Sequence, residues 1–280
     1  MGICKYCGKP AGFLKSKHKE CELKYNNGKS KIKLNIKEAL NNKINLADLL
    51  EEIDNIAKES FIKADETRKL IFRGWKEAVE AAFEDGILTE DEEKRLNEMI
   101  EVFNFNRDKL NSDSSYQKIV KGAILRDIMD GKLPDRVKIK GNIPFNLQKN
   151  EKIVWLFNDV DYYEKRTRRE YVGGYQGFSV RIAKGVYYRV GGFKGRPVTN
   201  TETVYIDSGI MAITNKHIYF SGGLKSFRIK YEKIVSFEPY SDGLGVQRDA
   251  QTAKPQIFVT GDGWFTFNLV KNLAELRKKE

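Results

Sequence analysis

Three cysteines and one histidine near the amino-terminus are the residues best suited to chemistry. They read Cys4-x-x-Cys7, ten residues, then His18-x-x-Cys21, and they include every cysteine of the 280-residue chain. Three thiols and an imidazole in two closely spaced pairs are the ligands that tetrahedral zinc prefers. The glycines and the proline of the intervening segment, GKPAGFLKSK, suit the turn that brings the pairs together. The spacing predicts a small zinc knuckle.

Two other interpretations of the cysteines remain open. They could be free thiols beside an unrelated histidine, or they could form a disulfide, although three cysteines leave one unpaired. A zinc ion held by four protein ligands has no open position for water or substrate, so we expect a structural ion. Such an ion contributes on the order of 10 kcal/mol, enough to fold a segment too short for its own core.

The distribution of charge supports three modules around this knuckle. Residues 1–33 carry nine lysines and two acidic residues, a net charge of +7. Residues 34–135 carry −7 and residues 136–280 carry +11, which gives the total of +11. We therefore expect a zinc ribbon or knuckle over 1–33, a helical domain over 34–135 and a third domain over 145–280. The sequence shows no signal peptide and no transmembrane segment, so a cytoplasmic protein is expected.

Apolar residues recur every three or four positions through the middle module, which predicts amphipathic helices. The predicted helices cover about 46–57, 70–83, 89–103 and 116–128. Thr89 followed by Glu92 is a capping box at the start of the third helix, and Gly86 and Gly131 are suited to the left-handed position after a helix. The stretch around Asp85-Gly86 resembles the helical junction of small domains related to the tellurite-resistance TerB fold. That resemblance implies a TerB-like bundle, and no metal site is transferred from it.

Beyond Pro144 the apolar period changes to two, which predicts strands. The predicted strands are 152–157, 177–182, 186–190, 202–206, 210–214, 217–220, 226–231 and 256–260. Their even spacing favours an antiparallel barrel, and Phe265, Leu269, Leu273 and Leu276 predict a final amphipathic helix. The expected fold class is therefore multidomain α+β: a zinc knuckle, a small helical bundle and an antiparallel β-barrel with a carboxy-terminal helix.

The motif DSGIMAITNKHIYF, which begins at Asp207, resembles the hairpin of bacterial pleckstrin-homology-like and GRAM-like domains. The resemblance continues through KSFRI and KIVSF, and it implies a pleckstrin-homology-like barrel. His217 stands where such domains often have Arg or Lys, so no basic ligand contact is transferred to it. The whole arrangement is similar to bacterial and phage-associated proteins that join a short zinc ribbon, a helical middle and this barrel. The similarity implies a role in bacterial stress response or phage–host conflict.

For two further features we prefer a structural role to a functional one. The sequence VGGYQG at residue 172 returns as VGGFKG at residue 190, and paired glycines between strands predict tight turns rather than a phosphate-binding loop. His217 lies in a predicted strand and is expected to be a structural histidine. No hydrolase, metalloprotease or kinase signature appears, so we expect no enzyme; no catalytic residue is assigned.

A group of basic and aromatic residues is the candidate binding surface of the third module. Its members are Lys165, Arg166, Arg168, Arg169, Tyr171 and Tyr175. Such a mixture suits phosphate contact and base stacking, or it protects an exposed edge strand. The lysines around the knuckle could likewise contact nucleic-acid phosphates or simply keep a small module soluble.

The sequence therefore favours a non-catalytic adaptor, in which the knuckle and the barrel engage a protein partner. One alternative is nucleic-acid binding through the two basic terminal modules. The other is binding of anionic membrane headgroups by the barrel. No exposed apolar anchor is identifiable in the sequence, which disfavours the membrane.

Overall fold

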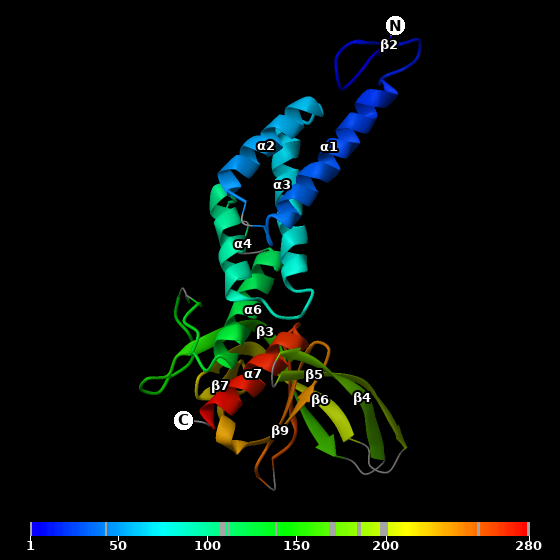
Figure 1. Cartoon of the computed structure of the whole chain (residues 1–280). Helices are drawn as coiled ribbons and strands as arrows, with labels where there is room; N and C mark the ends of the chain where they lie inside the picture. Colours follow the sequence, from blue (N-terminus) through cyan, green and yellow to red (C-terminus); the bar gives the residue numbers. More distant parts are fainter. Residues whose placement is uncertain are drawn as a thin grey trace. The chain divides into compact units, whose positions relative to one another are not determined.

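The computed structural model describes residues 2–42, 44–106, 110, 113–137, 139, 141–167, 172–183, 186–196, 201–250 and 253–278, with backbone alone between 166 and 201. It divides into two compact units, Met1–Ala123 and Ile124–Glu280. Each unit is described by itself (Figure 1). None of the helices in the described parts of the chain is both long and apolar enough to cross a membrane.

The first unit begins with a short hairpin and continues as a helical bundle (Figure 1). The hairpin pairs β1 (Gly2–Ile3) with β2 (Pro10–Gly12). The helices that follow are α1 (Lys19–Glu38), α2 (Leu46–Glu59), α3 (Ala64–Ala82), α4 (Glu90–Val102) and α6 (Ser114–Met129), the last of which continues into the second unit. The helical periodicity is thus confirmed for α2, α3, α4 and α6.

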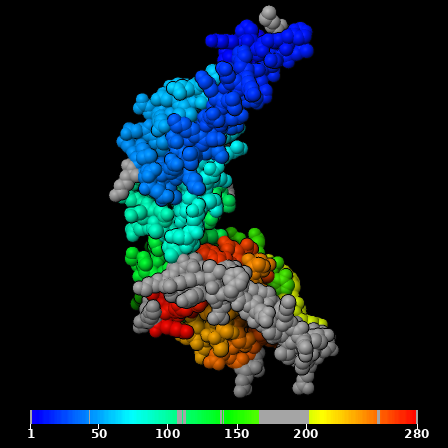
Figure 2. Space-filling model, turned by 45° about the vertical axis from the view of Figure 1, so that its right-hand side comes forward, coloured from blue at the N-terminus to red at the C-terminus, as the bar shows by residue number. Residues whose placement is uncertain are grey.

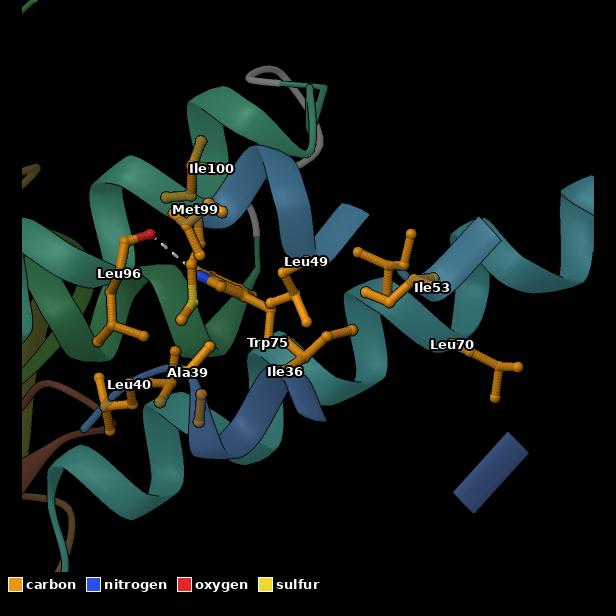
Figure 3. Packing of buried hydrophobic residues seen from close by; sticks show 14 of the residues in the cluster. Ile36, Ala39, Leu40, Leu49, Ile53, Leu70, Trp75, Leu96, Met99 and Ile100 are labelled. Atoms are coloured by element: carbon orange, nitrogen blue, oxygen red, sulfur yellow. Dashed lines mark hydrogen bonds between the residues drawn. The ribbon is translucent and has the colours of Figure 1, made fainter. Parts of the chain in front are cut away.

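The core of the bundle surrounds Trp75, which is fully buried (Figure 3). Ile36 of α1, Leu49 of α2 and Leu96 of α4 belong to the same buried cluster. The indole Nε1 of Trp75 donates a hydrogen bond to the carbonyl oxygen of Leu96 at 3.3 Å. The ring is therefore buried without leaving its one polar group unpaired.

Polar side chains define the ends of these helices. The Thr89 hydroxyl accepts the Glu92 N–H at 3.2 Å, and the Glu92 carboxylate accepts the Thr89 N–H at 3.0 Å, which confirms the capping box. Gly86 and Gly131 have φ angles of 83° and 78°, as expected for glycines after a helix. The Arg95 guanidinium donates from Nε to the Ala39 carbonyl at 2.9 Å, and so satisfies a backbone group at the end of α1.

Helices α1 and α3 cross so closely that Gly74 has no room for a side chain. A Cβ atom at this position would lie 2.9 Å from Ile36 Cβ and 3.2 Å from the Lys33 carbonyl oxygen. We expect Gly74→Ala to lower the free energy of unfolding by roughly 1–3 kcal/mol, because overpacking outweighs the gain in helix propensity. Thermal unfolding measures the effect, with the exposed Arg68→Ala on the same helix as control. A higher melting temperature for Gly74→Ala would contradict this packing.

The second unit contains one antiparallel sheet of seven strands. Its strand order is β8 (Ser226–Lys230), β7 (His217–Gly222), β6 (Thr201–Thr214), β3 (Ile153–Thr167), β11 (Gln256–Val259), β10 (Gly243–Arg248) and β9 (Ile234–Pro239). The expected closed barrel is wrong, because β8 and β9 are the two edges and do not pair with each other in the described sheet. Only the 3-10 turn η1 (Tyr231–Lys233) joins them, so the chain turns a corner there instead of forming a hairpin.

The predicted final helix is confirmed as α7 (Gly263–Arg277), which packs against β9, β10 and η1 (Figure 1). The Asp262 carboxylate accepts the Phe265 N–H at 3.1 Å and caps its first turn. Phe265, Leu269 and Leu273 are buried, and the Phe265 ring meets Trp155 of β3 edge-on at 5.0 Å. The unit is therefore a sheet covered by a carboxy-terminal helix.

The strands differ from the sequence expectation in three places. The predicted strands 202–206 and 210–214 form one continuous strand, β6, and the sequence pattern did not reveal β9 or β10. The glycine pairs lie inside strands rather than in turns: β4 (Val172–Ala183) pairs with β5 (Val186–Arg196), so that Gly173 faces Gly195 and Gly177 faces Gly191. The aromatic and β-branched residues between these glycines have the propensity that favours strands.

Candidate metal centre

The four expected zinc ligands come together at the junction between the hairpin and α1. Cys4 and Cys7 lie in the loop between β1 and β2. His18 is the residue before α1, and Cys21 lies in the first turn of the helix. The three thiols are free, and the four ligand atoms all lie within 4.8 Å of one another. The cluster predicted from the sequence is thus present, and the disulfide interpretation does not hold.

The distances between the ligand atoms fit a tetrahedral ion. The Nδ1 atom of His18 lies 3.4 Å from Cys7 Sγ and 3.6 Å from Cys21 Sγ. Zinc bonds of about 2.3 Å to sulfur and about 2.0 Å to nitrogen place such atoms roughly 3.5 Å apart. Zinc therefore fits the residues present, with Nδ1 as the nitrogen ligand.

Backbone groups orient the ligands. The His18 Nε2 atom lies 3.0 Å from the Pro10 carbonyl oxygen. Because a metal at Nδ1 needs a free lone pair there, the ring proton sits on Nε2 and is donated to Pro10, as is usual for metal-binding histidines. The His18 N–H lies 3.4 Å from Cys4 Sγ, so the same residue also supports a second ligand.

The turn and the neighbouring sulfur atoms shift the pKa values of two thiols in opposite directions. Burial raises the pKa of Cys4, but backbone N–H groups of Cys7, His18 and Tyr6 outweigh it and lower the pKa to about 6. Burial, together with contacts to the other two sulfur atoms, raises the pKa of Cys21 to about 11. Three thiolates at this separation repel one another, and a divalent ion removes that penalty.

Large apolar side chains stand exposed beside the centre. Phe13 and Leu14 follow β2 and are 84% and 91% exposed, and Ile3 of β1 is 67% exposed. Leu14 also has a φ of 57°, an unusual backbone conformation for a residue with a branched side chain. We call Ile3, Phe13 and Leu14 the apolar tip. This exposure was not predicted, because large hydrophobic residues are expected to be buried.

The knuckle lies at one end of its unit, beyond α1 (Figure 2, dark blue). A groove of about 680 Å³ runs beside the apolar tip and is lined by Leu14, Lys17 and Glu22 among others. The lysine and glutamate side chains form an ion pair across it. The surface around the zinc centre is therefore apolar at its apex and carries both signs of charge at its base.

Lys165, one of the predicted binding residues, has an acidic and an aromatic neighbour. Its Nζ atom lies 2.7 Å from Glu238 Oε2 and 5.6 Å from the centre of the Tyr240 ring. Burial lowers the pKa of Lys165, but these two neighbours outweigh it and hold the pKa above its usual range. Its charge is thus already matched within the sheet.

For the remaining members of that group, the structure describes no side chain. Arg166 lies in β3 and Tyr175 in β4, where the backbone alone is described. Arg168, Arg169 and Tyr171 lie outside the described residues.

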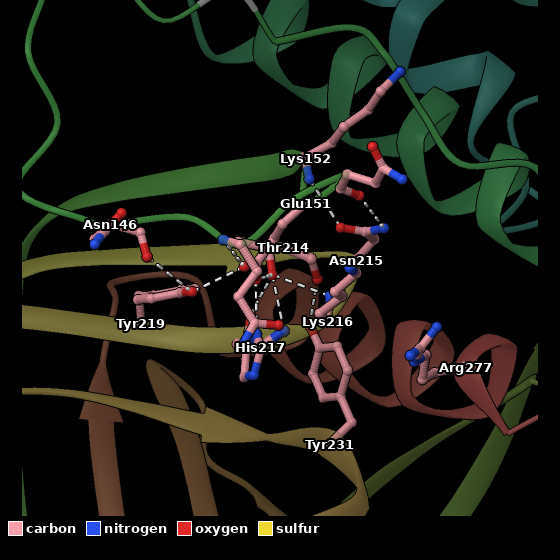
Figure 4. A network of polar contacts seen from close by, with 12 residues as sticks. Asn146, Glu151, Lys152, Thr214, Asn215, Lys216, His217, Tyr219, Tyr231 and Arg277 are labelled. Carbon is pink, nitrogen blue, oxygen red and sulfur yellow. Dashed lines mark hydrogen bonds and ion pairs between the residues drawn. The ribbon is translucent and has the colours of Figure 1, made fainter.

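His217 is buried at the start of β7, as expected for a structural histidine, and it belongs to a network that the sequence did not reveal (Figure 4). Its Nδ1 atom lies 2.8 Å from Glu151 Oε1. The same carboxylate accepts hydrogen bonds from the Thr214 hydroxyl at 2.6 Å and the Tyr219 hydroxyl at 2.9 Å. Glu151 lies just before β3 and belongs to no recognisable sequence motif, so its burial is seen only in the folded structure.

Comparison with known proteins gives this chain no family. No family model matches it, and no curated protein matches it.

Proposed function

We propose that this chain is a non-catalytic adaptor that binds a protein partner through its zinc knuckle, with zinc as a structural ion. The observation that carries the proposal is the exposed apolar tip beside a four-ligand centre. A folded module exposes such side chains at an energetic cost, and exposed apolar groups of this kind mark interaction sites. Phe13 and Leu14 lie between the ligands Cys7 and His18, so the zinc ion would anchor the segment that carries them to the start of α1.

The mixed charges around the tip favour a protein over a phosphate-rich surface. Lys15, Lys17 and Lys19 share the groove with Glu20 and Glu22. Those carboxylates offset most of the lysine charge within the groove, so a nucleic-acid backbone or an anionic lipid surface would gain little attraction there. A polar rim of both signs around an apolar centre is the usual composition of a protein–protein interface. The partner we propose has an apolar pocket bordered by acidic and basic residues.

The resemblances noted in the sequence extend this proposal. The strand order and the covering helix of the second unit support a pleckstrin-homology-like domain, here with an open sheet, and α2 to α6 support a TerB-like bundle. We propose that the sheet domain presents a second surface to the partner. A cytoplasmic role in bacterial stress response or phage–host conflict follows from the same resemblances.

The apolar tip supplies the test. Immobilised full-length protein would be used to capture its partner from the native host, and the affinity of the purified pair would then be measured. We expect the double substitution Phe13→Ser and Leu14→Ser to weaken binding about thirtyfold or more, as for the loss of a hot spot. Leu34→Ser, which changes an apolar residue of α1 that is 51% exposed, should leave binding unchanged.

The same variants distinguish the two alternatives. Zinc content and α1 helicity should match the wild type, which shows that the knuckle remains folded. Retention on DNA or RNA that falls with added salt would instead support nucleic-acid binding. Pelleting with anionic vesicles that the double substitution abolishes would support membrane binding, for which the apolar tip provides the anchor that the sequence did not show. Partner affinity that is equal for the double variant and the wild type would refute the proposed surface.

A further inference from the structure

Strand β8 forms one edge of the seven-stranded sheet, and it is the more open of the two edges. In the described sheet it pairs only with β7. The opposite edge, β9, packs against α7 and ends at Pro239, which has no N–H to donate. Edge strands present unpaired backbone groups to which another chain can bind. Strand β8 is therefore the edge better suited to accept an added strand.

The register of the hairpin shows which backbone groups of β8 face outward. The Lys225 carbonyl oxygen accepts the last N–H of β7 across the turn at 2.8 Å. Bonded and non-bonded pairs alternate along an antiparallel ladder, so the next residues that bond to β7 are Phe227 and Ile229. The N–H and C=O groups of Ser226 and Arg228 therefore point away from β7, toward the free edge.

The side chains at this edge are basic on one face. Alternate residues of a strand share a face, so Ser226, Arg228 and Lys230 lie together, and all three are exposed. Lys225 is exposed in the turn before them. Among the described residues, no ion pair involves any of these three cations. The nearest acidic residue along the chain, Glu232, is paired with an arginine of α7 at 3.4 Å, so the edge keeps an excess of positive charge.

The turn that leads into β8 is held in place from within the sheet. The Asp207 carboxylate of β6 accepts the N–H groups of Leu224, at 2.6 Å, and Lys225, at 2.7 Å. Hydrogen bonds to a charged acceptor are stronger than those between neutral groups. The edge is thus formed before any partner arrives, which lowers the entropic cost of binding.

We propose that β8 binds an extended acidic segment of a partner protein, which adds to the sheet as an antiparallel strand. The backbone of the segment pairs with the outward N–H and C=O groups of Ser226 and Arg228. Directly opposed residues of antiparallel strands lie on the same face, so acidic side chains of the segment meet Arg228 and Lys230. A second copy of this chain does not suit the edge, because it would set the same cations against one another.

This inference rests on the adaptor proposal only in taking the occupant to be a protein, and it names the second surface and the kind of segment bound there. The apolar tip takes no part, because it belongs to the other unit. The double substitution of Phe13 and Leu14 by serine should therefore leave binding at β8 unchanged. A failure of either surface is then seen separately from a failure of the other.

Fluorescence anisotropy with the full chain and a labelled peptide, acetyl-EVEVEVE-amide, tests the proposal. In the proposed register the glutamates lie opposite Ser226, Arg228 and Lys230, and their backbone N–H groups face β8. N-methylation of two central glutamates should weaken binding about tenfold or more, because it removes those donors. N-methylation of two valines, whose N–H groups face away, should change binding little. The peptide acetyl-KVKVKVK-amide should not bind, because its charges are repelled.

Substitutions in the protein separate backbone pairing from charge. Ser226→Pro removes an outward N–H and leaves the ladder with β7 intact, so it should weaken binding about tenfold, whereas Ser226→Ala should not. Arg228→Glu should weaken binding about tenfold or more, because it places like charges opposite each other. Lys278→Glu, an equal change of charge at the exposed end of α7, should have no effect. Thermal unfolding shows whether each variant is folded; if Ser226→Pro is not, the methylated peptides test the same pairing.

Three results would overturn the proposal. They are no binding of the acidic peptide, equal or reversed effects of the two methylated sets, and binding that Arg228→Glu leaves unchanged. The first would mean that the cations only guard an exposed edge against aggregation. Self-association of the chain that Arg228→Glu abolishes would assign the edge to a second copy, and binding of single-stranded DNA in place of the peptide would assign its cations to phosphates; each would also refute it.

Discussion

Removal of zinc by a chelator is expected to unfold roughly the first 24 residues and to leave the rest of the chain folded. Structural zinc contributes on the order of 10 kcal/mol, and the hairpin has no core of its own large enough to replace that. Beyond the ligands, the Tyr6 ring packs at a tilt of 39° against Tyr25 of α1, with the ring centres 4.8 Å apart. The metal is therefore the principal link between the hairpin and the helix.

The contacts of α1 with the bundle explain why unfolding should stop near Tyr25. The Tyr25 hydroxyl donates to Glu66 at 2.5 Å, and Lys29 forms an ion pair with the same carboxylate at 3.1 Å. Ile32 and Ile36 are fully buried in the bundle core. From Tyr25 onward the helix is thus held by packing that does not involve the metal.

Hydrogen exchange with mass spectrometry measures this result directly. Amides of residues 2–24 should lose protection in the chelated protein, and those of α3 and α4 should keep it. Cys7→Ser should give the same pattern, with bound zinc lost. Lys9→Ser, in the same loop, keeps the backbone hydrogen bond from the Cys4 N–H to the Lys9 carbonyl at 2.9 Å and should give neither effect. A hairpin that keeps its protection after complete removal of zinc would show that the ion is not structural.

The parts of this protein that the sequence predicts are those whose partners lie close together along the chain. The zinc ligands span 18 residues and the capping box spans four. The helices are recognised from apolar residues three and four positions apart. In each case the spacing alone determines the geometry. Local patterns were therefore sufficient for the knuckle, for α2, α3, α4 and α6 and for the final helix, but they did not predict α1, most of which was assigned to the zinc module.

The parts that the sequence could not predict depend on residues far apart in the chain. Glu151 meets His217 across 66 positions, and Gln256 meets Tyr162 across 94. Strand β10 reads GLGVQR, which has neither the alternation nor the composition of a typical strand, and it forms because β9 and β11 lie on either side of it. The open sheet depends likewise on a single corner at η1, which no propensity indicates.

Substitution of Glu151 is expected to be among the most damaging changes in the second unit. Its side chain is fully buried, and it accepts four hydrogen bonds. Thr214 and His217 donate to Oε1, while Tyr219 and the backbone N–H of Gln148 donate to Oε2. Glu151→Ala should lower the free energy of unfolding by roughly 3–5 kcal/mol, because it removes every acceptor and leaves the buried donors unpaired.

Glu151→Gln keeps the volume of the side chain but removes its charge and one of its two acceptor oxygens. The amide has one NH₂ group, which is a donor. If this group takes the place of Oε2, it faces the backbone N–H of Gln148, which is also a donor and cannot reorient. At Oε1 it would face His217 and Thr214 instead. Neither orientation keeps all four hydrogen bonds to the carboxylate, and the second requires the His217 proton to move to Nε2 and the Thr214 hydroxyl to donate to the His217 carbonyl alone, so we expect a loss of roughly 1–3 kcal/mol. Glu275→Gln, at an exposed position of α7, should change stability by less than about 0.5 kcal/mol.

The same carboxylate gives the second unit a defined response to acid. Burial raises the pKa of Glu151, but the hydrogen bonds from Thr214, Gln148, His217 and Tyr219 outweigh it and lower the pKa below its usual value. The stability that Glu151 contributes is then fully present above about pH 4.3, the ordinary value for glutamate, and is lost as pH falls through the lower folded value. Urea unfolding at a series of pH values, followed by hydrogen exchange of β6 and β7, should show this loss in the wild type and a shallower one in Glu151→Ala. Identical acid profiles for the two proteins would mean that the carboxylate is not ionised in the folded state, and the network would then have to be held by a shared proton rather than by charge.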